Sequence, residues 1–142
     1  VFSALADRWR RKQGKGAPPL VCTNGQVNLA TMVLLDLLVK SGAMLYYSGD
    51  FDPEGLLIAD RLKTRFGAGL RLCRYSVDDY ARAISERKLA AGRLKQLERL
   101  VDKTLKQVGQ EVLNRGYAGY QELLIDDLWG DLRALMEHCL SD

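Results

Sequence analysis

The stretch AMLYYSGDFDPEGLLIADRLKTRFGAGLRLCRY, residues 43–75, decides the expected fold. Its first six residues, 43–48, form an apolar run that predicts a β-strand, and residues 70–75 predict a second strand. Between them, Pro53 suits the first turn of a helix and Gly67 suits its end. A strand, a helix and a strand in this order predict a βαβ unit with two parallel strands. The fold class that follows is α/β.

The sequence on either side of this unit predicts further helices and one more strand. Residues 20–23 (LVCT) form a short apolar run typical of a strand, and residues 28–42 have the apolar spacing and terminal glycine of a packed helix. Residues 76–79 (SVDD) predict the capping box of a short helix. Two long amphipathic helices are expected over residues 88–114 and 120–140. The predicted architecture is a small parallel sheet flanked by helices, with a helical C-terminal extension.

The composition is that of a single globular domain. The chain has 142 residues, of which 47% are hydrophobic and 27% are charged. It contains no apolar run of the roughly 18 residues that a membrane span needs and no signal peptide, so a cytoplasmic location is expected. Because the first residue is not methionine, the sequence is expected to be a piece of a longer chain.

The few cysteines and the single histidine restrict the kinds of metal site, disulfide and catalytic site that the chain can form. The three cysteines, Cys22, Cys73 and Cys139, are widely spaced and form no CxxC pair, which favours core packing over a zinc site or a disulfide framework. His138 is the single histidine, so a histidine-based catalytic triad or metal cluster is excluded.

Charge is unevenly distributed along the chain. Residues 121–142 carry six acids against one arginine, a net charge of −5. Since the whole chain has a net charge of +3, residues 1–120 carry a net charge of +8. This basic remainder suits contact with an anionic polymer. Residues 1–17, with the run RWRRKQGKG, are predicted to be a basic helix and linker from an upstream region, and residues 18–142 the domain proper. The basic run is suited to phosphate contacts or to plain solvation.

Two aspartates that follow the strand at 43–48 are the candidate catalytic and metal-binding residues. Alternate residues of an extended segment point the same way, so Asp50 and Asp52 share one face while Phe51 turns towards the core. Two carboxylates without histidine or cysteine suit Mg²⁺ or Mn²⁺. A structural explanation competes for Asp52, which precedes Pro53 and suits a helix N-cap, while Glu54 suits the helix dipole. That explanation leaves Asp50 unaccounted for.

Three segments carry a resemblance to known proteins. SGDFDPEG, residues 48–55, resembles the DxDPxG segment of Toprim domains, especially that of the topoisomerase VI A subunit. The wider stretch at residues 19–62 is similar to the Toprim-like C-terminal domain of the nuclease subunit of Wadjet-type plasmid-defence systems. GYAGYQELLIDDLWGDL, residues 116–132, resembles the closing helix of that domain, and the whole resemblance covers roughly residues 18–135.

The resemblance implies metal-dependent DNA strand cleavage by hydrolysis. In Toprim domains a glutamate after the first strand joins the two aspartates in holding Mg²⁺; here Asp50 and Asp52 match the pair. Thr23 and the following asparagine stand where the glutamate is expected. Candidates for the missing ligand are Thr23 itself and the acids Glu54 and Glu122.

The resemblance also implies a biological setting. The expected partners are DNA and the subunits of a condensin-like ATPase complex in a bacterial defence system, at the nucleoid, with a homodimer as a further expectation. The alternative is a degenerate, non-catalytic Toprim module that docks DNA or partner subunits.

Overall fold

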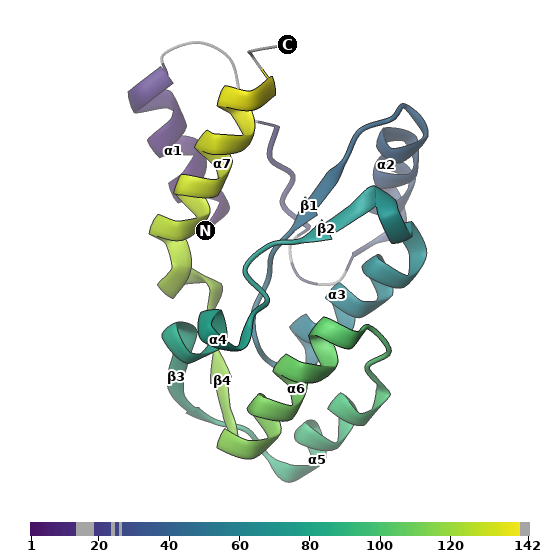
Figure 1. The fold of residues 1–142 in the computed structure, drawn as a ribbon, viewed down its shortest axis with the longest axis vertical. Helices are drawn as coiled ribbons and strands as arrows, with labels where there is room; N and C mark the ends of the chain where they lie inside the picture. Colours follow the sequence, from purple (N-terminus) through teal and green to yellow (C-terminus); the bar gives the residue numbers. More distant parts are fainter. Residues whose placement is uncertain (14–18, 24, 26, 140–142) are drawn as a thin grey trace.

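The computed structural model describes residues 1–13, 19–23, 25 and 27–139 (Figure 1). The elements in chain order are α1 (Phe2–Gln13), α2 (Leu29–Lys40), β1 (Leu45–Tyr47), α3 (Pro53–Phe66), η1 (Gly67–Gly69), β2 (Leu70–Leu72), α4 (Val77–Ala83), β3 (Ile84–Lys88), α5 (Ala91–Leu94), η2 (Lys95–Arg99), α6 (Lys103–Arg115), β4 (Tyr117–Gly119), η3 (Gln121–Leu124) and α7 (Ile125–Cys139). The fold is mixed α/β and mostly helical, as the sequence predicts at the level of class. Among the described residues, no helix combines the length and apolar character that crossing a bilayer requires.

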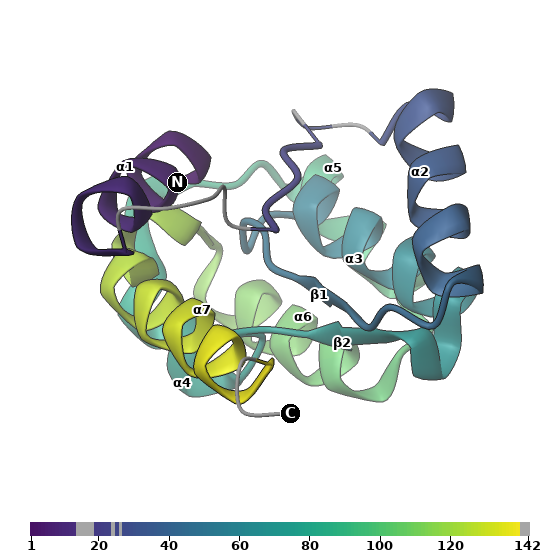
Figure 2. The ribbon, with the colours of Figure 1, turned by 90° about the horizontal axis from the view of Figure 1, so that it is seen from above.

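The predicted βαβ unit is present. β1 and β2 pair in parallel, with Leu45 opposite Leu70 and Tyr47 opposite Leu72, and α3 connects them. α3 ends where Gly67 takes a φ of 51°, a value that glycine adopts without steric cost. α2 covers the same unit (Figure 2), and an apolar cluster that includes Leu35 of α2 and Leu70 holds the layers together. The predicted capping box at the start of α4 is also confirmed.

The strand predicted at residues 20–23 is wrong. These residues have no regular secondary structure, and within the described ranges β1 pairs with β2 alone. Leu20 and Val21 instead line a cavity beside β1, which explains the apolar run without a strand. The prediction that Cys22 packs in the core is also wrong, because its side chain is exposed, whereas Cys73 is half-buried.

The single helix predicted over residues 88–114 is wrong as well. The segment begins at the end of β3, continues through α5 and η2, and becomes a long helix only at α6. The break is made by Asp60 of α3, which is 5% exposed. Its Oδ1 accepts the backbone N–H groups of Val101 and Asp102 at 3.0 and 2.8 Å. Asp102 then caps α6 by accepting the backbone N–H of Thr104 at 2.9 Å. A buried acceptor from another element thus outweighs the helical periodicity.

An antiparallel pair, β3 and β4, forms a second small sheet that the sequence did not predict. It lies beside α4 and α6 (Figure 1), over the largest apolar cluster of the described chain. That cluster includes Phe51, Tyr80 and Leu105, each 0% exposed. The residue between the two candidate aspartates therefore belongs to the main core.

The two terminal helices pack against each other. Both views place α1 beside α7 (Figures 1 and 2), and the rings of Trp9 and Trp129 meet edge to face with centroids 6.5 Å apart. Arg8 donates to Asp126 at 2.6 Å. The basic helix predicted within residues 1–17 is present as α1, and it contacts the C-terminal helix. The helix predicted over residues 120–140 is present as the short turn η3 followed by α7.

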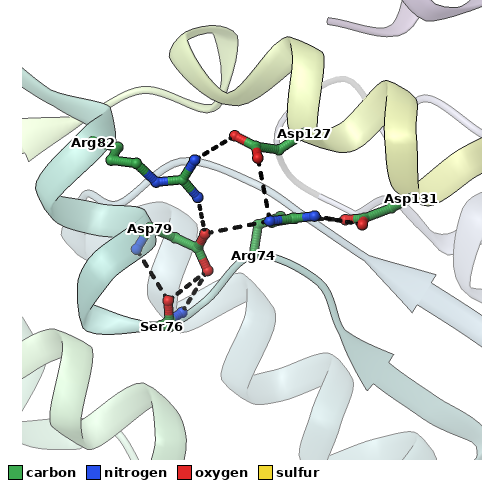
Figure 3. A network of polar contacts seen from close by, with 6 residues as sticks. All are labelled: Arg74, Ser76, Asp79, Arg82, Asp127 and Asp131. Atoms are coloured by element: carbon green, nitrogen blue, oxygen red, sulfur yellow. Dashed lines mark hydrogen bonds and ion pairs between the residues drawn. The ribbon is translucent and has the colours of Figure 1, made fainter.

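The acids of α7 bind arginines of the same chain (Figure 3). Arg74, in the loop between β2 and α4, donates its Nε to Asp131 at 2.6 Å and its Nη1 to Asp127 at 3.4 Å. Arg82 of α4 bridges Asp79 and Asp127, at 2.7 Å to each. Arg74 takes a φ of 60°, which a residue with a side chain rarely adopts. The acidic C-terminal helix is therefore held against α4 and its preceding loop by charge pairing.

Candidate functional site

The loop that carries the two candidate aspartates is anchored by the residue between them. Phe51 is fully buried, and its ring lies 5.7 Å from that of Tyr80, centroid to centroid. Its N–H donates to the carbonyl of Gly119 at 2.9 Å, and the Gly119 N–H donates back at 3.1 Å. This backbone bridge joins the loop to β4, so Asp50 and Asp52 are positioned by a segment almost 70 residues further along the chain.

Asp50 is half-buried and is held by a main-chain donor. Its Oδ1 accepts the backbone N–H of Gln121 at 2.9 Å. Burial raises the pKa of Asp50, the Gln121 hydrogen bond opposes the rise, and the negative charges of Glu122 and Asp52 add to it. A carboxylate in this environment gains from a nearby cation, which would offset both the desolvation and the like-charge repulsion.

Asp52 caps α3, as the structural explanation predicts. Its Oδ1 accepts the backbone N–H of Gly55 at 2.8 Å, and Pro53 occupies the first turn. Position 55 requires glycine, because a β-carbon there would collide with the carbonyl oxygen of Asp50. The proline and the glycine of the DxDPxG segment therefore both serve the local backbone. The other oxygen, Oδ2, is not used by the cap.

An arginine that the sequence did not single out contacts this second oxygen. Arg93 of α5 donates its Nη2 to Asp52 Oδ2 at 2.9 Å, and the same guanidinium binds both carboxylate oxygens of Glu54. The hydrogen bonding of Arg93 to Glu54 lowers the pKa of Glu54. We refer to Asp50, Asp52 and Glu54 as the acidic ledge. Arg93 lies about 40 residues further along the chain, and the local sequence around it gives no signal of the contact.

All five predicted site residues line one cavity of about 590 Å³: Thr23, Asp50, Asp52, Glu54 and Glu122. Leucines from α1, α7 and the segment before Thr23 also line it, together with Asp131 of α7: Leu5, Leu20, Leu128, Leu132 and Leu135. The structure thus brings together candidates from three separate parts of the chain. Asn24, the neighbour of Thr23, lies outside the described residues.

Comparison with known proteins identifies a family. A family model described as "Protein of unknown function C-terminus (DUF2399)" matches residues 1–132. The chain belongs to the DUF2399 family. No curated protein and no solved structure matches it. The part matched to DUF2399 begins before α1 and ends within α7, so it contains the acidic ledge, Arg93 and the β4–η3 segment. It also extends across the boundary predicted at residue 17, and that boundary stays a prediction.

Two tyrosines behind the acidic ledge of this DUF2399 domain remain protonated. A β-carbon on Gly49 would lie 2.9 Å from the hydroxyl of Tyr75 and 3.1 Å from that of Tyr47, so a larger residue here would require these hydroxyls to shift. Burial, with the charge of Asp50 as a second cause, raises the pKa of Tyr47 to about 12. Burial also raises the pKa of Tyr75. Neither phenol is therefore a ready nucleophile, because the phenolate is the reactive form.

The donor atoms fit a hard divalent cation. Asp50 uses Oδ1 for Gln121, and no protein donor to its Oδ2 is found among the described residues. Carboxylate oxygens of this kind are the ligands that Mg²⁺ and Mn²⁺ prefer, and these ions usually keep several waters. The described residues contain no ready cluster of three or more acidic, histidine or cysteine ligands. Holding a cation with more than Asp50 and Asp52 would therefore need Glu122 or Glu54 to move.

Proposed function

We propose that this DUF2399 domain has a Toprim-like fold and cleaves DNA phosphodiester bonds with Mg²⁺ or Mn²⁺. The observation that carries the proposal is the convergence of Asp50, Asp52 and Glu122 on one cavity at the end of β1. The parallel β1–α3–β2 unit, with its acids after the first of the two strands, supports the Toprim resemblance. Ligands of open parallel sheets bind at this end of the strands.

The residues of the chain have distinct roles in this mechanism. Asp50 and Asp52 would hold the cation, with Glu122 as a substitute for the missing glutamate, because Glu54 is engaged by Arg93, and with Thr23 as a neutral neighbour. When bound, the cation supplies positive charge at the scissile phosphate and lowers the pKa of a water molecule. The Gln121 N–H fixes one oxygen of Asp50 and leaves the other for the cation. The N-terminus of α3 adds a partial positive charge beside the cavity, which favours a phosphate.

The setting that we propose follows from the resemblance and from the charge distribution. The partners would be DNA and the subunits of a condensin-like ATPase complex in the bacterial cytoplasm, at the nucleoid, and a homodimer remains a prediction. The charge of +8 outside residues 121–142 suits DNA. Part of this charge, on Arg8, Arg74 and Arg82, is paired with acids of α7, so the DNA contacts would come from the basic residues outside these pairs.

A second candidate function is a non-catalytic module that docks DNA or partner subunits. Two observations favour it: Thr23 brings no charge to the cavity, and Arg93 pairs with both Asp52 and Glu54 and so offsets part of their negative charge. In such a module the arginine would be a permanent part of the site.

Nicking of supercoiled plasmid with Mn²⁺ separates the two candidates. The variants are Asp50→Asn, which keeps the size of the side chain, and Asp78→Asn, which changes an exposed aspartate of α4 outside the cavity lining. We expect metal-dependent nicking by the wild type and by Asp78→Asn, and none by Asp50→Asn. DNA binding without nicking in all three proteins would support the docking module instead.

A further inference from the structure

We propose that Arg93 is an exchangeable counter-cation: it holds the acidic ledge while no metal is bound, yields Asp52 to a divalent ion, and then contacts a DNA phosphate. The exchange rests on the proposed function, because it needs a metal ion at Asp50 and Asp52. It adds a residue from α5 that neither the sequence motif nor the family description includes.

The contacts show that Arg93 stands where a cation is needed. Its guanidinium binds Asp52 Oδ2, the oxygen that the helix cap leaves available, and both oxygens of Glu54. Because Asp52 Oδ1 already serves the Gly55 N–H, a metal ion and Arg93 would compete for the same atom. Two cations cannot both occupy one carboxylate oxygen at contact distance without strong repulsion.

The ion pairs of Arg93 with Asp52 and Glu54 are exposed enough for a divalent ion to replace the guanidinium. The side chains of Arg93, Glu54 and Asp52 are 30%, 42% and 19% exposed, so water reaches the guanidinium and weakens its ion pairs, that with Glu54 more than that with Asp52. α5 is only four residues long and has no side-chain N-cap. Mg²⁺ and Mn²⁺ carry twice the charge of a guanidinium and prefer carboxylate oxygens.

A second arginine indicates where the released guanidinium would act. Arg87 of β3 donates to the hydroxyl of Tyr120 at 3.1 Å. That hydrogen bond raises the pKa of Arg87. Tyr120 directly precedes Gln121, whose N–H binds Asp50 at 2.9 Å, so Arg87 is tied to the segment that holds the acidic ledge. Once Asp52 binds a metal ion, the released Arg93 would join Arg87 as a second guanidinium available to a phosphate. Guanidiniums bind phosphate oxygens in pairs of hydrogen bonds, so this is the composition of a phosphate clamp.

Calorimetric titration with Mn²⁺ alone tests the competition directly. The proteins are the wild type, Arg93→Gln, Arg93→Lys, and the control Arg115→Gln, which removes a partly exposed arginine paired with Glu111 of the same helix. We expect Arg93→Gln to bind Mn²⁺ roughly three- to fivefold more tightly, the factor that corresponds to the upper range of an exposed ion pair. Arg93→Lys should lie between, since lysine keeps the charge but not the forked geometry. The Arg115→Gln variant should match the wild type.

The outcomes separate this exchange from the proposed function. Equal or weaker Mn²⁺ binding by both Arg93 variants, with binding lost in Asp50→Asn, overturns the exchange and leaves the metal site standing. Equal Mn²⁺ binding by the wild type and Asp50→Asn removes the metal site, and with it both proposals. If Arg93→Gln does not fold, the titration of Arg93→Lys decides by the same comparison.

Fluorescence anisotropy with a short DNA duplex tests the phosphate contact. With Ca²⁺ in place of Mn²⁺, so that binding is measured apart from cleavage, Arg93→Gln should reduce the slope of log K against log salt by about one, the value for a lost phosphate contact. Without a divalent ion the slope should not change, because Arg93 is then bound to the ledge. A slope that is unchanged with Ca²⁺, or that changes equally without it, contradicts the release of Arg93.

Discussion

Replacing Asp52 by asparagine or by alanine separates its role as a helix cap from its role as a ligand. Asparagine can still accept the Gly55 N–H through its side-chain oxygen, whereas alanine cannot. A lost cap costs about 1 kcal/mol. Both variants also lose the ion pair with Arg93, worth about 0.5 kcal/mol at this exposure. The free energy of unfolding should therefore fall by about 1.5 kcal/mol in Asp52→Ala and by about 0.5 kcal/mol in Asp52→Asn.

Urea unfolding measures this difference, and Mn²⁺ titration with plasmid nicking measures the ligand role. The gap of about 1 kcal/mol between the variants corresponds to about 3–4 °C in melting temperature for a chain of this length. Both variants should lose nicking and most Mn²⁺ affinity, because neither keeps the carboxylate. Equal destabilisation by asparagine and alanine would refute the cap, and nicking at the wild-type rate in Asp52→Asn would refute the ligand role.

Three further predictions concern the core and the charges around the site. Asp60→Ala leaves two backbone N–H groups without their buried acceptor and should lower the free energy of unfolding by about 2–4 kcal/mol in urea; a loss below about 1 kcal/mol would contradict this account of the break before α6. Folding raises the pKa of Asp50, so its contribution to stability is full below the ordinary pKa of an aspartate and is lost as pH rises through the folded pKa. The stability of the wild type relative to Asp50→Asn should thus fall from about pH 4 upwards, and a difference that does not vary with pH would argue against a buried charge. Arg74→Gln removes the arginine paired with Asp131 and leaves Arg82 as the remaining arginine beside Asp79 and Asp127, so it should lower the melting temperature most at low salt and less at about 1 M NaCl, where the Debye length is about 3 Å; a loss independent of salt would indicate packing instead of charge.

The sequence predicted the elements whose signals are local. The Asp52–Pro53 start of α3, its glycine end and the capping box of α4 each depend on residues within a few positions, so they could be read without knowing the fold. The same holds for the alternation that buries Phe51 between the two aspartates.

The errors come from contacts between distant parts of the chain. The periodicity over residues 88–114 is real, but Asp60 interrupts the helix from another element, and nothing near Val101 indicates it. The apolar run at residues 20–23 was interpreted as a strand, whereas Leu20 and Val21 face a cavity. Arg93 has no local signal of its contacts in the sequence, because its partners lie about 40 residues away.

The backbone bridge between Phe51 and Gly119 makes two segments that are distant in sequence open together. The amide protons of Phe51 and Gly119 are each bound to the other residue's carbonyl, and that of Gln121 is bound to Asp50. None of the three can exchange with solvent while the segments stay joined, so one opening event should release all of them. Hydrogen exchange should therefore give similar protection at these three amides, although they span 71 positions of the chain. A disturbance that loosens β4 or η3 would reach the carboxylates directly, without passing through the sheet of β1 and β2.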